Sequence, residues 1–407
     1  MYQFSEQSLE LQQRLQAFMD EHIYPNEHAY AEHMHHAQNR WAAVPLMDEL
    51  KQKARDAGLW NLFIPPSLAQ FADHDGLSNF DYAPLAELMG RVLWSPEVFN
   101  CNAPDTGNME VLMKYGTEAQ QQEWLTPLLA GEIRSSYAMT EPQVASSDAT
   151  NVELRIQQDG DEWVLNGRKW FITNAMYERT RIFIVMGKSD PDNPSRHQQQ
   201  SQVLVPKGTA GLELVRPLTT LGYDDAPLGH AELRLTDVRV PAENILLGAG
   251  RGFEIAQGRL GPGRIHHCMR LIGIAQRSLE LACARVEQRS TFGRTLSRHQ
   301  SVREDISRCY SEIEMARLLV LKTCARMDEV GAKGAMDLIA ASKTSVPLMM
   351  QQVIDRCMQM HGAGGLTEDY CMAEGFNYAR WCRQADGPDQ VHQMALGKMI
   401  IKRYTEQ

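Results

Sequence analysis

The chain has 407 residues, of which 43% are apolar and 23% are charged. This length exceeds one small hydrophobic core and predicts two or three domains of about 150 residues each, and the composition excludes an intrinsically disordered chain. The formal net charge of −10 argues against a nucleic-acid or anionic-membrane surface, because both need clustered cations. The sequence contains no run of about 18 apolar residues, so we expect no integral membrane association.

The N-terminal segment and the cysteines bear on the cellular compartment. Residues 1–20 are acidic and amphipathic, unlike a signal peptide or a transit peptide. The eight cysteines form no Cys-x-x-Cys pair and lie mostly in apolar helical surroundings, which predicts reduced packing residues. The final residues, TEQ, are not a peroxisomal signal. We expect a cytoplasmic, bacterial-type protein, with a mitochondrial or peroxisomal origin as the alternative.

The hydrophobic period divides the chain into three parts. In residues 1–133 apolar residues recur at helical spacing between Gly, Pro and polar breaks, which predicts five or six helices. In residues 134–248 the period falls to two and turn residues separate short strands, which predicts a β-barrel or β-sandwich. In residues 249–407 the helical period returns in long runs. These runs cover residues 268–286, 302–320, 335–360 and 388–404.

Four long amphipathic helices most simply form a bundle. The predicted fold is therefore α+β and multidomain. It consists of an N-terminal all-α domain (1–133), a central β-barrel or sandwich domain (134–248) and a C-terminal four-helix bundle (249–407).

Residues 137–175 carry the most informative chemical pattern. A tight turn at residues 141–142 offers backbone amides, and Trp170 and Phe171 place an aromatic pair on a predicted strand. Small hydroxyl side chains are also available, at Thr140, Ser146, Ser147 and Thr173. Small donors beside a flat aromatic face suit a planar, oxygen-rich, phosphate-bearing ligand. The alternative is a turn followed by two ordinary strands.

Several motifs occur in the order found in one known family. YAMTEPQVASSD and KWFITN, within residues 137–174, resemble the stretches Y-x-x-T-E-P-x-A-G-S-D and K-x-W-I-T-N of the acyl-CoA dehydrogenases. QRSTFGRTLSRHQ (288–300) resembles R-x-T-F-G-x-x-L-x-x-H-Q, and QMHGAGGLTED (359–369) resembles Q-x-x-G-G-x-G. The resemblance extends over essentially the whole chain. It implies the helical–β–helical fold of that family and an oxidoreductase that uses FAD.

The resemblance implies two groups of FAD contacts. In the same subunit, the isoalloxazine and pyrophosphate are lined by Tyr137, Met139, Thr140, Ser147, Phe171 and Thr173. The QVASSD turn is one residue longer than that of the family, so Ser146 and Ser147 compete for the phosphate role. The residues implied to reach the FAD of a neighbouring subunit are Arg289, Thr291, Phe292, Gln300, Gln359, Gly362, Gly364 and Gly365. A homo-oligomer is therefore expected, as a dimer of dimers, because family members are usually tetramers.

The resemblance also implies a catalytic base that takes the α-proton of the substrate. Most members use a Glu, and the aligned run ADGPDQVHQ places Asp386 at that position, with Pro388 and Gln390 at flavin-contacting positions. Some members carry the base on an earlier helix, where this chain has Gly263. Asp withdraws the carboxylate by about 1.5 Å relative to Glu, and we expect burial beside a neutral flavin and thioester to raise the pKa of Asp386. The alternative is a turn residue in D-G-P.

The segments GPGRIHHCMR (261–270) and ADGPD resemble the branch of family members ten and eleven. The residues then expected to contact the substrate are Leu260, Arg264, His266, His267 and Gly387. In this interpretation Arg264 contacts the CoA phosphates or the acyl pocket, and the histidines bind a polar substituent on the acyl chain. The alternative for the histidines is a solvated or interface helix face. His33, His35 and His36 lack the partners of a metal site, and no metal is expected.

The function implied by the resemblance is oxidation of an acyl-CoA to the trans-2-enoyl-CoA in fatty-acid β-oxidation. Asp386 takes the α-proton, a hydride passes to flavin N5, and an electron-transfer flavoprotein accepts the electrons. One alternative is a nitroalkane-oxidase-like enzyme, which also uses an Asp base but has an Arg where this chain has Gln393. The other is a non-catalytic flavoprotein that serves as an assembly or DNA-binding factor. The acidic composition argues against DNA binding.

Overall fold

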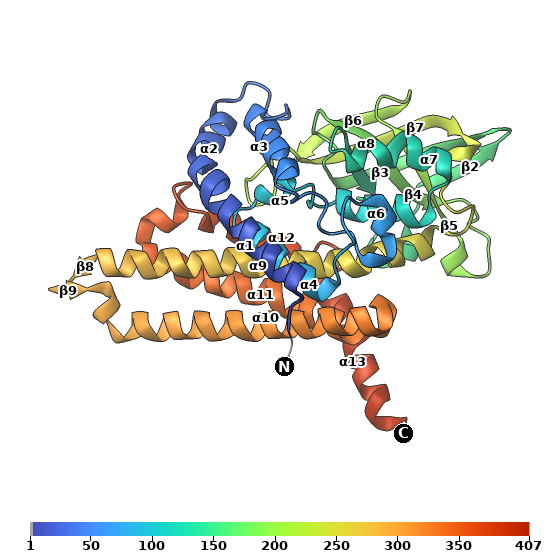
Figure 1. The fold of residues 1–407 in the computed structure, drawn as a ribbon. Helices are drawn as coiled ribbons and strands as arrows, with labels where there is room; N and C mark the ends of the chain where they lie inside the picture. The colour runs from blue at the N-terminus through green and yellow to red at the C-terminus, as the bar shows by residue number, and fades with distance from the viewer. Residues whose placement is uncertain (1–2, 407) are drawn as a thin grey trace.

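The computed structural model describes residues 3–406, apart from the side chains of Leu260 and Pro262. Figure 1 shows an N-terminal group of helices, a curled sheet and a long helical bundle. In the described part of the chain no helix has both the length and the apolar character needed to cross a bilayer. The predicted α+β architecture is confirmed, with the helical, β and helical parts in the expected order.

The N-terminal part is helical up to residue 129. Its helices are α1 (Glu6–Phe18), α2 (Glu27–His36), α3 (Pro45–Asp56), α4 (Asn79–Gly90), α5 (Ser95–Val98), α6 (Asp105–Tyr115), α7 (Glu118–Gln120) and α8 (Thr126–Leu129). Two of them begin at serines whose hydroxyl groups accept a backbone N–H of the first turn, Ser5 at α1 and Ser78 at α4. Pro65 and Pro66 end the preceding segment, as expected, and a 3-10 turn (Pro66–Phe71) follows.

The central part forms one seven-stranded sheet. Its strands are β1 (Arg134–Ala138), β2 (Arg155–Asp159), β3 (Glu162–Thr173), β4 (Thr180–Lys188), β5 (Gln200–Pro206), β6 (Leu212–Leu218) and β7 (His230–Pro241). The strand order is β1-β4-β2-β3-β7-β6, with β5 paired to β4. The sequence pattern did not predict β1 and β2, because RSSYA and RIQQD are short and mostly polar. A register shift between Lys169 and Ile172 of β3 interrupts its pairing with β7, and this bulge positions a site residue described below.

The C-terminal part is built on three long helices, which pack against one another. It contains α9 (Gly252–Gln288), β8 (Ser290–Thr291), β9 (Arg294–Thr295), α10 (Gln300–Gly334), α11 (Met336–His361), α12 (Met372–Cys382) and α13 (Asp389–Thr405). The β8–β9 hairpin protrudes at the end of the bundle where α9 meets α10 (Figure 1). The pattern predicted α9, α10, α11 and α13 but not the 11-residue helix α12.

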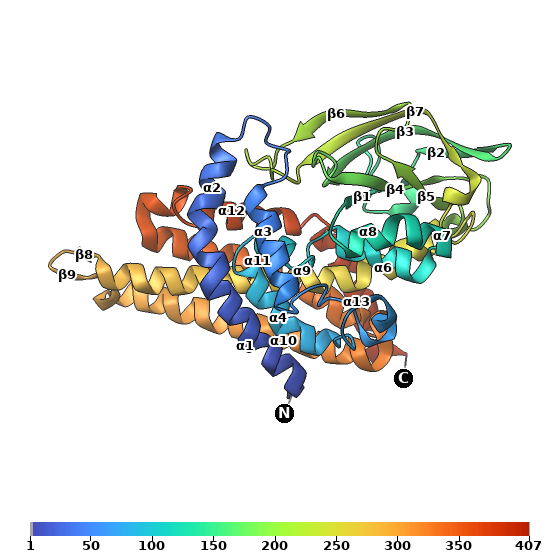
Figure 2. The ribbon, with the colours of Figure 1, turned by 45° about the horizontal axis from the view of Figure 1, so that its top comes forward.

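The helical and β parts are joined through a buried charge network. Arg134 of β1 is fully buried and contacts Asp105 of α6 at 2.7 Å and Glu97 of α5 at 2.6 Å. Lys51 of α3 contacts the same Glu97 at 2.5 Å. Helix α6 in turn packs on both β1 and α9 (Figure 2). Buried charges are tolerated when they are paired, so this network fixes the first strand against the helices that wall the site.

The eight cysteines are all free, and six of them are fully buried. This agrees with the prediction that they are packing residues rather than a disulfide framework.

Candidate functional site

A cavity of about 2170 Å³ lies where the three parts of the chain meet. Its wall includes residues of α2, β3, α9 and α12 and of the loop between α12 and α13. The structure brings twelve of the predicted site residues to this cavity: Tyr137, Met139, Thr140, Ser146, Ser147, Phe171, Thr173, Arg264, His267, Asp386, Gly387 and Pro388. Residues from three separate parts of the sequence therefore face one space.

The turn after β1 is held by a buried ion pair. Lys169 of β3 is fully buried, and its Nζ donates to Glu141 Oε1 and to the Met139 carbonyl oxygen, both at 2.7 Å. Glu141 also accepts the backbone N–H groups of Glu153 and Leu154 at 2.7 and 2.9 Å. These bonds fix the segment that carries the predicted hydroxyl donors.

The structure distinguishes the two serines that compete for the phosphate role. The Ser146 hydroxyl accepts the Glu141 N–H at 2.9 Å and is therefore used inside the turn. Ser147 is exposed to the cavity, and within the described residues its hydroxyl makes no hydrogen bond. Ser147 is the better placed of the two to donate to a ligand.

Phe171 presents its ring to the cavity because of the bulge in β3. Its φ of 52° lies in the left-handed region, and the residue is 43% exposed. Left-handed backbone at a bulky residue is costly and is concentrated at functional sites. Trp170 packs against this ring at 5.0 Å between centroids and an interplanar angle of 63°. The predicted aromatic face is thus built by the strand, with Thr173 on the same strand lining the cavity.

Tyr137 is anchored by two residues that the sequence did not single out. Its hydroxyl accepts Gln202 Nε2 at 2.8 Å, and the Arg259 guanidinium lies 4.0 Å from its ring centroid. Burial, the largest cause, raises the pKa of Tyr137 to about 12. Tyr137 is therefore a neutral hydroxyl at the cavity wall.

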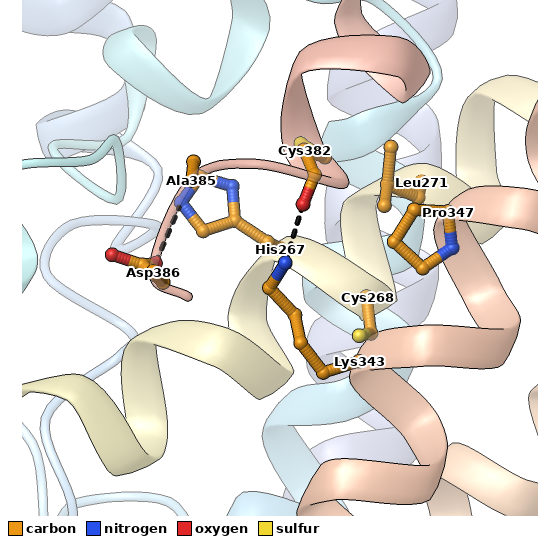
Figure 3. Close-up of a pocket in the computed structure, with 8 residues that line it drawn as sticks. All are labelled: His267, Cys268, Leu271, Lys343, Pro347, Cys382, Ala385 and Asp386. Carbon is orange, nitrogen blue, oxygen red and sulfur yellow. Dashed lines mark hydrogen bonds and ion pairs between the residues drawn. The ribbon is translucent and has the colours of Figure 1, made fainter. Parts of the chain in front are cut away.

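Asp386 lies in the loop between α12 and α13, with a φ of 55°. Its carbonyl oxygen accepts Arg264 Nε at 3.0 Å and His392 Nε2 at 3.2 Å, so two side chains hold the backbone of the turn. Its carboxylate Oδ2 lies 3.7 Å from His267 Nε2 (Figure 3). The carboxylate faces the cavity and is 21% exposed there.

The residues of the chain itself do not raise the pKa of Asp386, and the rise expected beside a neutral flavin and thioester stays a prediction. Burial does act to raise this pKa, but positively charged neighbours outweigh it, and the pKa lies below its ordinary value. The neighbours that lower the pKa are His267, Arg259, Lys343 and Arg264. Burial and then Arg270 lower the pKa of His267 to about 3, so its imidazole is neutral at pH 7. The low pKa of Asp386 rests first on His267 and then on Arg259, Lys343 and Arg264, and Asp386 is a carboxylate at neutral pH.

Lys343 is the neighbour that the sequence gave least reason to expect. It lies on α11, is 2% exposed, and donates from Nζ to the Cys382 carbonyl oxygen (Figure 3). A buried ammonium group with a single carbonyl partner leaves its charge largely uncompensated. The carboxylate of Asp386 lies in the same small enclosed space as Lys343 and supplies the opposite charge.

Only one of the two predicted substrate histidines reaches the cavity. His267 lines it, with Nδ1 3.0 Å from the Tyr378 hydroxyl and 3.4 Å from Arg270 Nη2. Because Arg270 donates to Nδ1, the neutral imidazole carries its proton on Nε2, toward Asp386. His266 is not among the described residues that line the cavity and packs edge-on against Tyr82, with ring centroids 5.0 Å apart. The two histidines face different surroundings because consecutive residues of an α-helix point about 100° apart. The Leu260 side chain lies outside the described residues.

The residues predicted to reach a neighbouring FAD do not line this cavity within the described chain. Arg289, Thr291 and Phe292 lie at the protruding hairpin end of the bundle (Figure 1), and Phe292 is 93% exposed with a φ of 49°. Gln300 begins α10, Gln359 lies in the last turn of α11, and Gly362, Gly364 and Gly365 form the 3-10 turn (Gly362–Leu366) that follows. Gln390 is exposed in the first turn of α13. The contact of the hairpin, Gln300, Gln359 and glycine-turn residues with the FAD of a second subunit stays a prediction, as does the flavin contact of Gln390.

Comparison with known proteins gives a consistent match over the chain. The models of the N-terminal, middle and C-terminal domains of acyl-CoA dehydrogenase match residues 5–132, 136–238 and 250–401. Acyl-CoA dehydrogenase FadE2 of Mycobacterium tuberculosis is 45% identical, over 99% of this chain and 97% of its own length. A solved Mycobacterium abscessus structure, described as an acyl-CoA dehydrogenase, has 46% identity and a TM-score of 0.95, covering 99% of this chain and 100% of that chain.

A second curated relative is longer than this chain. Mouse acyl-CoA dehydrogenase family member 10 is 51% identical over 96% of this chain but over 37% of its own length. The chain spans about half the length, or less, of the first curated relatives that it matches.

Proposed function

The chain belongs to the acyl-CoA dehydrogenase family of flavin-dependent oxidoreductases, and we propose that it removes two hydrogens from an acyl-CoA thioester to give the trans-2-enoyl-CoA. The observation that carries this proposal is the position of Asp386. It is an ionised carboxylate that lines the same cavity as the hydroxyl and aromatic residues of β3 and the turn after β1.

The residues of β3 and of the turn after β1 fit FAD. The cavity is large enough for a dinucleotide and a substrate together, and the free hydroxyl of Ser147 is a donor of the kind that binds phosphate. The exposed Phe171 ring offers a face for a planar ring system. When bound, FAD supplies the acceptor for the hydride that leaves the substrate β-carbon. Residues proposed to hold it are Tyr137, Met139, Thr140, Ser147, Phe171, Thr173 and Pro388.

Asp386 takes the α-proton in this proposal. Its carboxylate is unprotonated at neutral pH because of the surrounding cations, so it accepts a proton onto a carboxylate oxygen without prior ionisation. Arg264 and His392 hold the turn by its carbonyl oxygen, so these two side chains do not occupy the carboxylate. His267 is positioned by Tyr378 and Arg270, and its Nε2–H faces the carboxylate.

Three further features follow from family membership as proposals. An electron-transfer flavoprotein accepts the electrons. The chain assembles as a homo-oligomer in which the hairpin residues Arg289, Thr291 and Phe292 and the turn at residues 362–365 serve a neighbouring FAD. The protein acts in fatty-acid β-oxidation in the cytoplasm.

An anaerobic titration with acyl-CoAs tests the proposed function. The panel runs from short to very long chains and includes straight, branched and 4-hydroxy members, and the visible flavin band is recorded. We expect rapid bleaching by one group of substrates. Oxygen consumption with nitroethane is the control for nitroalkane chemistry. A yellow protein that no acyl-CoA bleaches would contradict the proposal.

A further inference from the structure

A second chain of polar groups leads away from the proposed flavin wall. Thr173 Oγ1 lies 3.0 Å from His230 Nδ1, and His230 Nε2 lies 3.3 Å from Asp225 Oδ2. These three residues come from the end of β3, the start of β7 and the loop before β7. The imidazole therefore connects the Thr173 hydroxyl to a carboxylate on the opposite side of the ring.

His230 is a buried residue that lies between the Thr173 hydroxyl and the Asp225 carboxylate. It is 4% exposed, and the edge of its ring meets Trp381 at 5.7 Å between centroids and an interplanar angle of 89°. Its buried Nε2 has no aligned hydrogen bond, although Asp225 lies within reach. Buried polar atoms are normally satisfied, and Asp225 Oδ2 at 3.3 Å is the acceptor nearest to hand for a proton on His230 Nε2.

Asp225 provides the outlet. Its side chain is 36% exposed and the residue lines the cavity, so its carboxyl group is accessible to solvent. The Asp225 carbonyl oxygen accepts the Gly229 N–H at 2.8 Å, which closes the turn and holds the carboxylate beside His230.

We propose that Thr173, His230 and Asp225 form a proton relay that serves the flavin side of the reaction, separately from Asp386. The relay rests on the proposed function, because it assumes that Thr173 contacts the bound flavin. Its task belongs to the second half of the catalytic cycle. In that half, two electrons pass to an external acceptor, and one proton must leave the part of the cavity next to the Thr173 hydroxyl.

The proton balance of the relay is closed. Thr173 Oγ1 accepts the departing proton and gives its own to His230 Nδ1. His230 releases the proton from Nε2 to the Asp225 carboxylate, which becomes a neutral carboxylic acid and later loses the proton to solvent. Thr173 ends unchanged, and His230 ends as the other neutral tautomer. Its return to the starting tautomer, by loss of the Nδ1 proton and gain of one Nε2 proton in exchange with solvent, completes the cycle without a net change in protons. One proton enters and one leaves, and the electrons go to the external acceptor.

The charges around the relay suit this role. Burial lowers the pKa of His230 to about 4, so the imidazole is neutral at pH 7 and carries protons as a tautomer. Burial and then Asp224 raise the pKa of Asp225 to about 7, where a carboxyl group both accepts and releases protons. The titratable and charged groups nearby are Asp224 with its partner Arg40, Glu374, Glu368, Tyr30 and Tyr378.

Stopped-flow reoxidation of the FAD-loaded protein tests the relay. The flavin is reduced with dithionite, which needs no acyl-CoA, and is then mixed with ferricenium, a one-electron acceptor. We expect Asp225→Asn to slow reoxidation about 10- to 100-fold and to remove its pH dependence near 7. His230→Phe should do the same, and His230→Gln, which keeps hydrogen bonding but has no tautomers, should not rescue it. Glu32→Gln is the matched control, because it neutralises an exposed carboxyl group that lines the same cavity outside the relay.

A second readout does not use the loaded enzyme. In the FAD-free protein, infrared titration of the carboxyl band should show two groups titrating near pH 7, Asp225 and Glu374, of which one is lost in Asp225→Asn. The midpoint of the Asp225 group should move in His230→Phe. Wild-type reoxidation rates in Asp225→Asn with full FAD content would overturn the relay. Failure of every acyl-CoA to reduce the flavin would contradict the proposed function instead, and the dithionite experiment separates the two results.

Discussion

Two aspartates line the same cavity, both with a φ of 55°, and their carboxyl groups behave in opposite ways. The pKa of Asp386 lies below its ordinary value, whereas that of Asp225 rises to about 7. Burial acts to raise both values. What differs is the neighbouring groups, since Asp386 has His267, Arg259, Lys343 and Arg264 nearby, and Asp225 has another carboxylate, Asp224. Burial alone therefore does not predict the protonation of a cavity carboxyl; the sign of the neighbouring charges decides it.

The largest expected effect is that of removing the Asp386 carboxylate on flavin reduction. Asp386→Asn keeps the size of the side chain but removes the base, so substrate reduction of the flavin should fall by about 10² to 10⁴-fold. FAD content should be unchanged, because the carboxylate is not among the residues proposed to bind FAD. Anaerobic stopped-flow measurement of flavin bleaching checks both points. Normal bleaching in this variant would eliminate Asp386 as the base.

The next variant removes one cation from the Asp386 side. Lys343→Met replaces a buried ammonium group by an apolar side chain of similar length. Loss of a nearby positive charge destabilises the carboxylate, so the pKa of Asp386 should rise and the acid limb of the kcat/KM profile should move to higher pH. Lys343→Arg, which keeps the charge, is the control. An acid limb that stays in place in Lys343→Met would show that Lys343 does not act on Asp386.

The third variant tests the Asp225 side through stability. A carboxyl whose folded-state pKa is raised from about 4 to about 7 favours folding fully at low pH, and this contribution is lost as the pH rises through 7. An Asn at position 225 does not ionise, so the Asp225→Asn variant should not lose stability as the pH rises through 7. Its Tm relative to wild type should therefore be higher at pH 8 than at pH 5. Asp192→Asn, in an exposed loop, is the control. Equal differences in Tm at both pH values would contradict the raised pKa.

The smallest effect concerns the wall that both aspartates face. Ser147→Ala should weaken FAD binding about 2- to 10-fold, which corresponds to one ordinary hydrogen bond. Ser146→Ala should act mainly on the turn, because its hydroxyl already bonds Glu141, and should lower Tm more than it weakens FAD binding. Fluorescence titration of the FAD-free protein measures the affinities. The opposite ranking would exchange the roles of the two serines.

Much of the architecture was predictable because long elements carry strong periodic signals. The helices α10 and α11 each bury one face over 26 residues or more, and such a stripe is visible in sequence. Helix α9 is also long, but its residues 264–275 are buried on every side. The short elements β1, β2 and α12 were missed, since five to eleven residues hold little periodicity. The motif in residues 137–174 identified the wall around Thr140, Phe171 and Thr173, because those side chains are contiguous along β1, its turn and β3.

The sequence by itself determined the order of the helical and β parts, the residues of the proposed flavin wall and the identity of Asp386 as the candidate base. Only the tertiary structure decided the charge of that base, the direction in which His266 points and the link from Thr173 through His230 to Asp225. The physical reason is that electrostatic environment is set by groups distant in sequence. Lys343 and Arg264 reach Asp386 from α11 and α9, and Thr173 and His230 lie 57 residues apart. Local patterns record which face of an element is buried, but not which charges meet there.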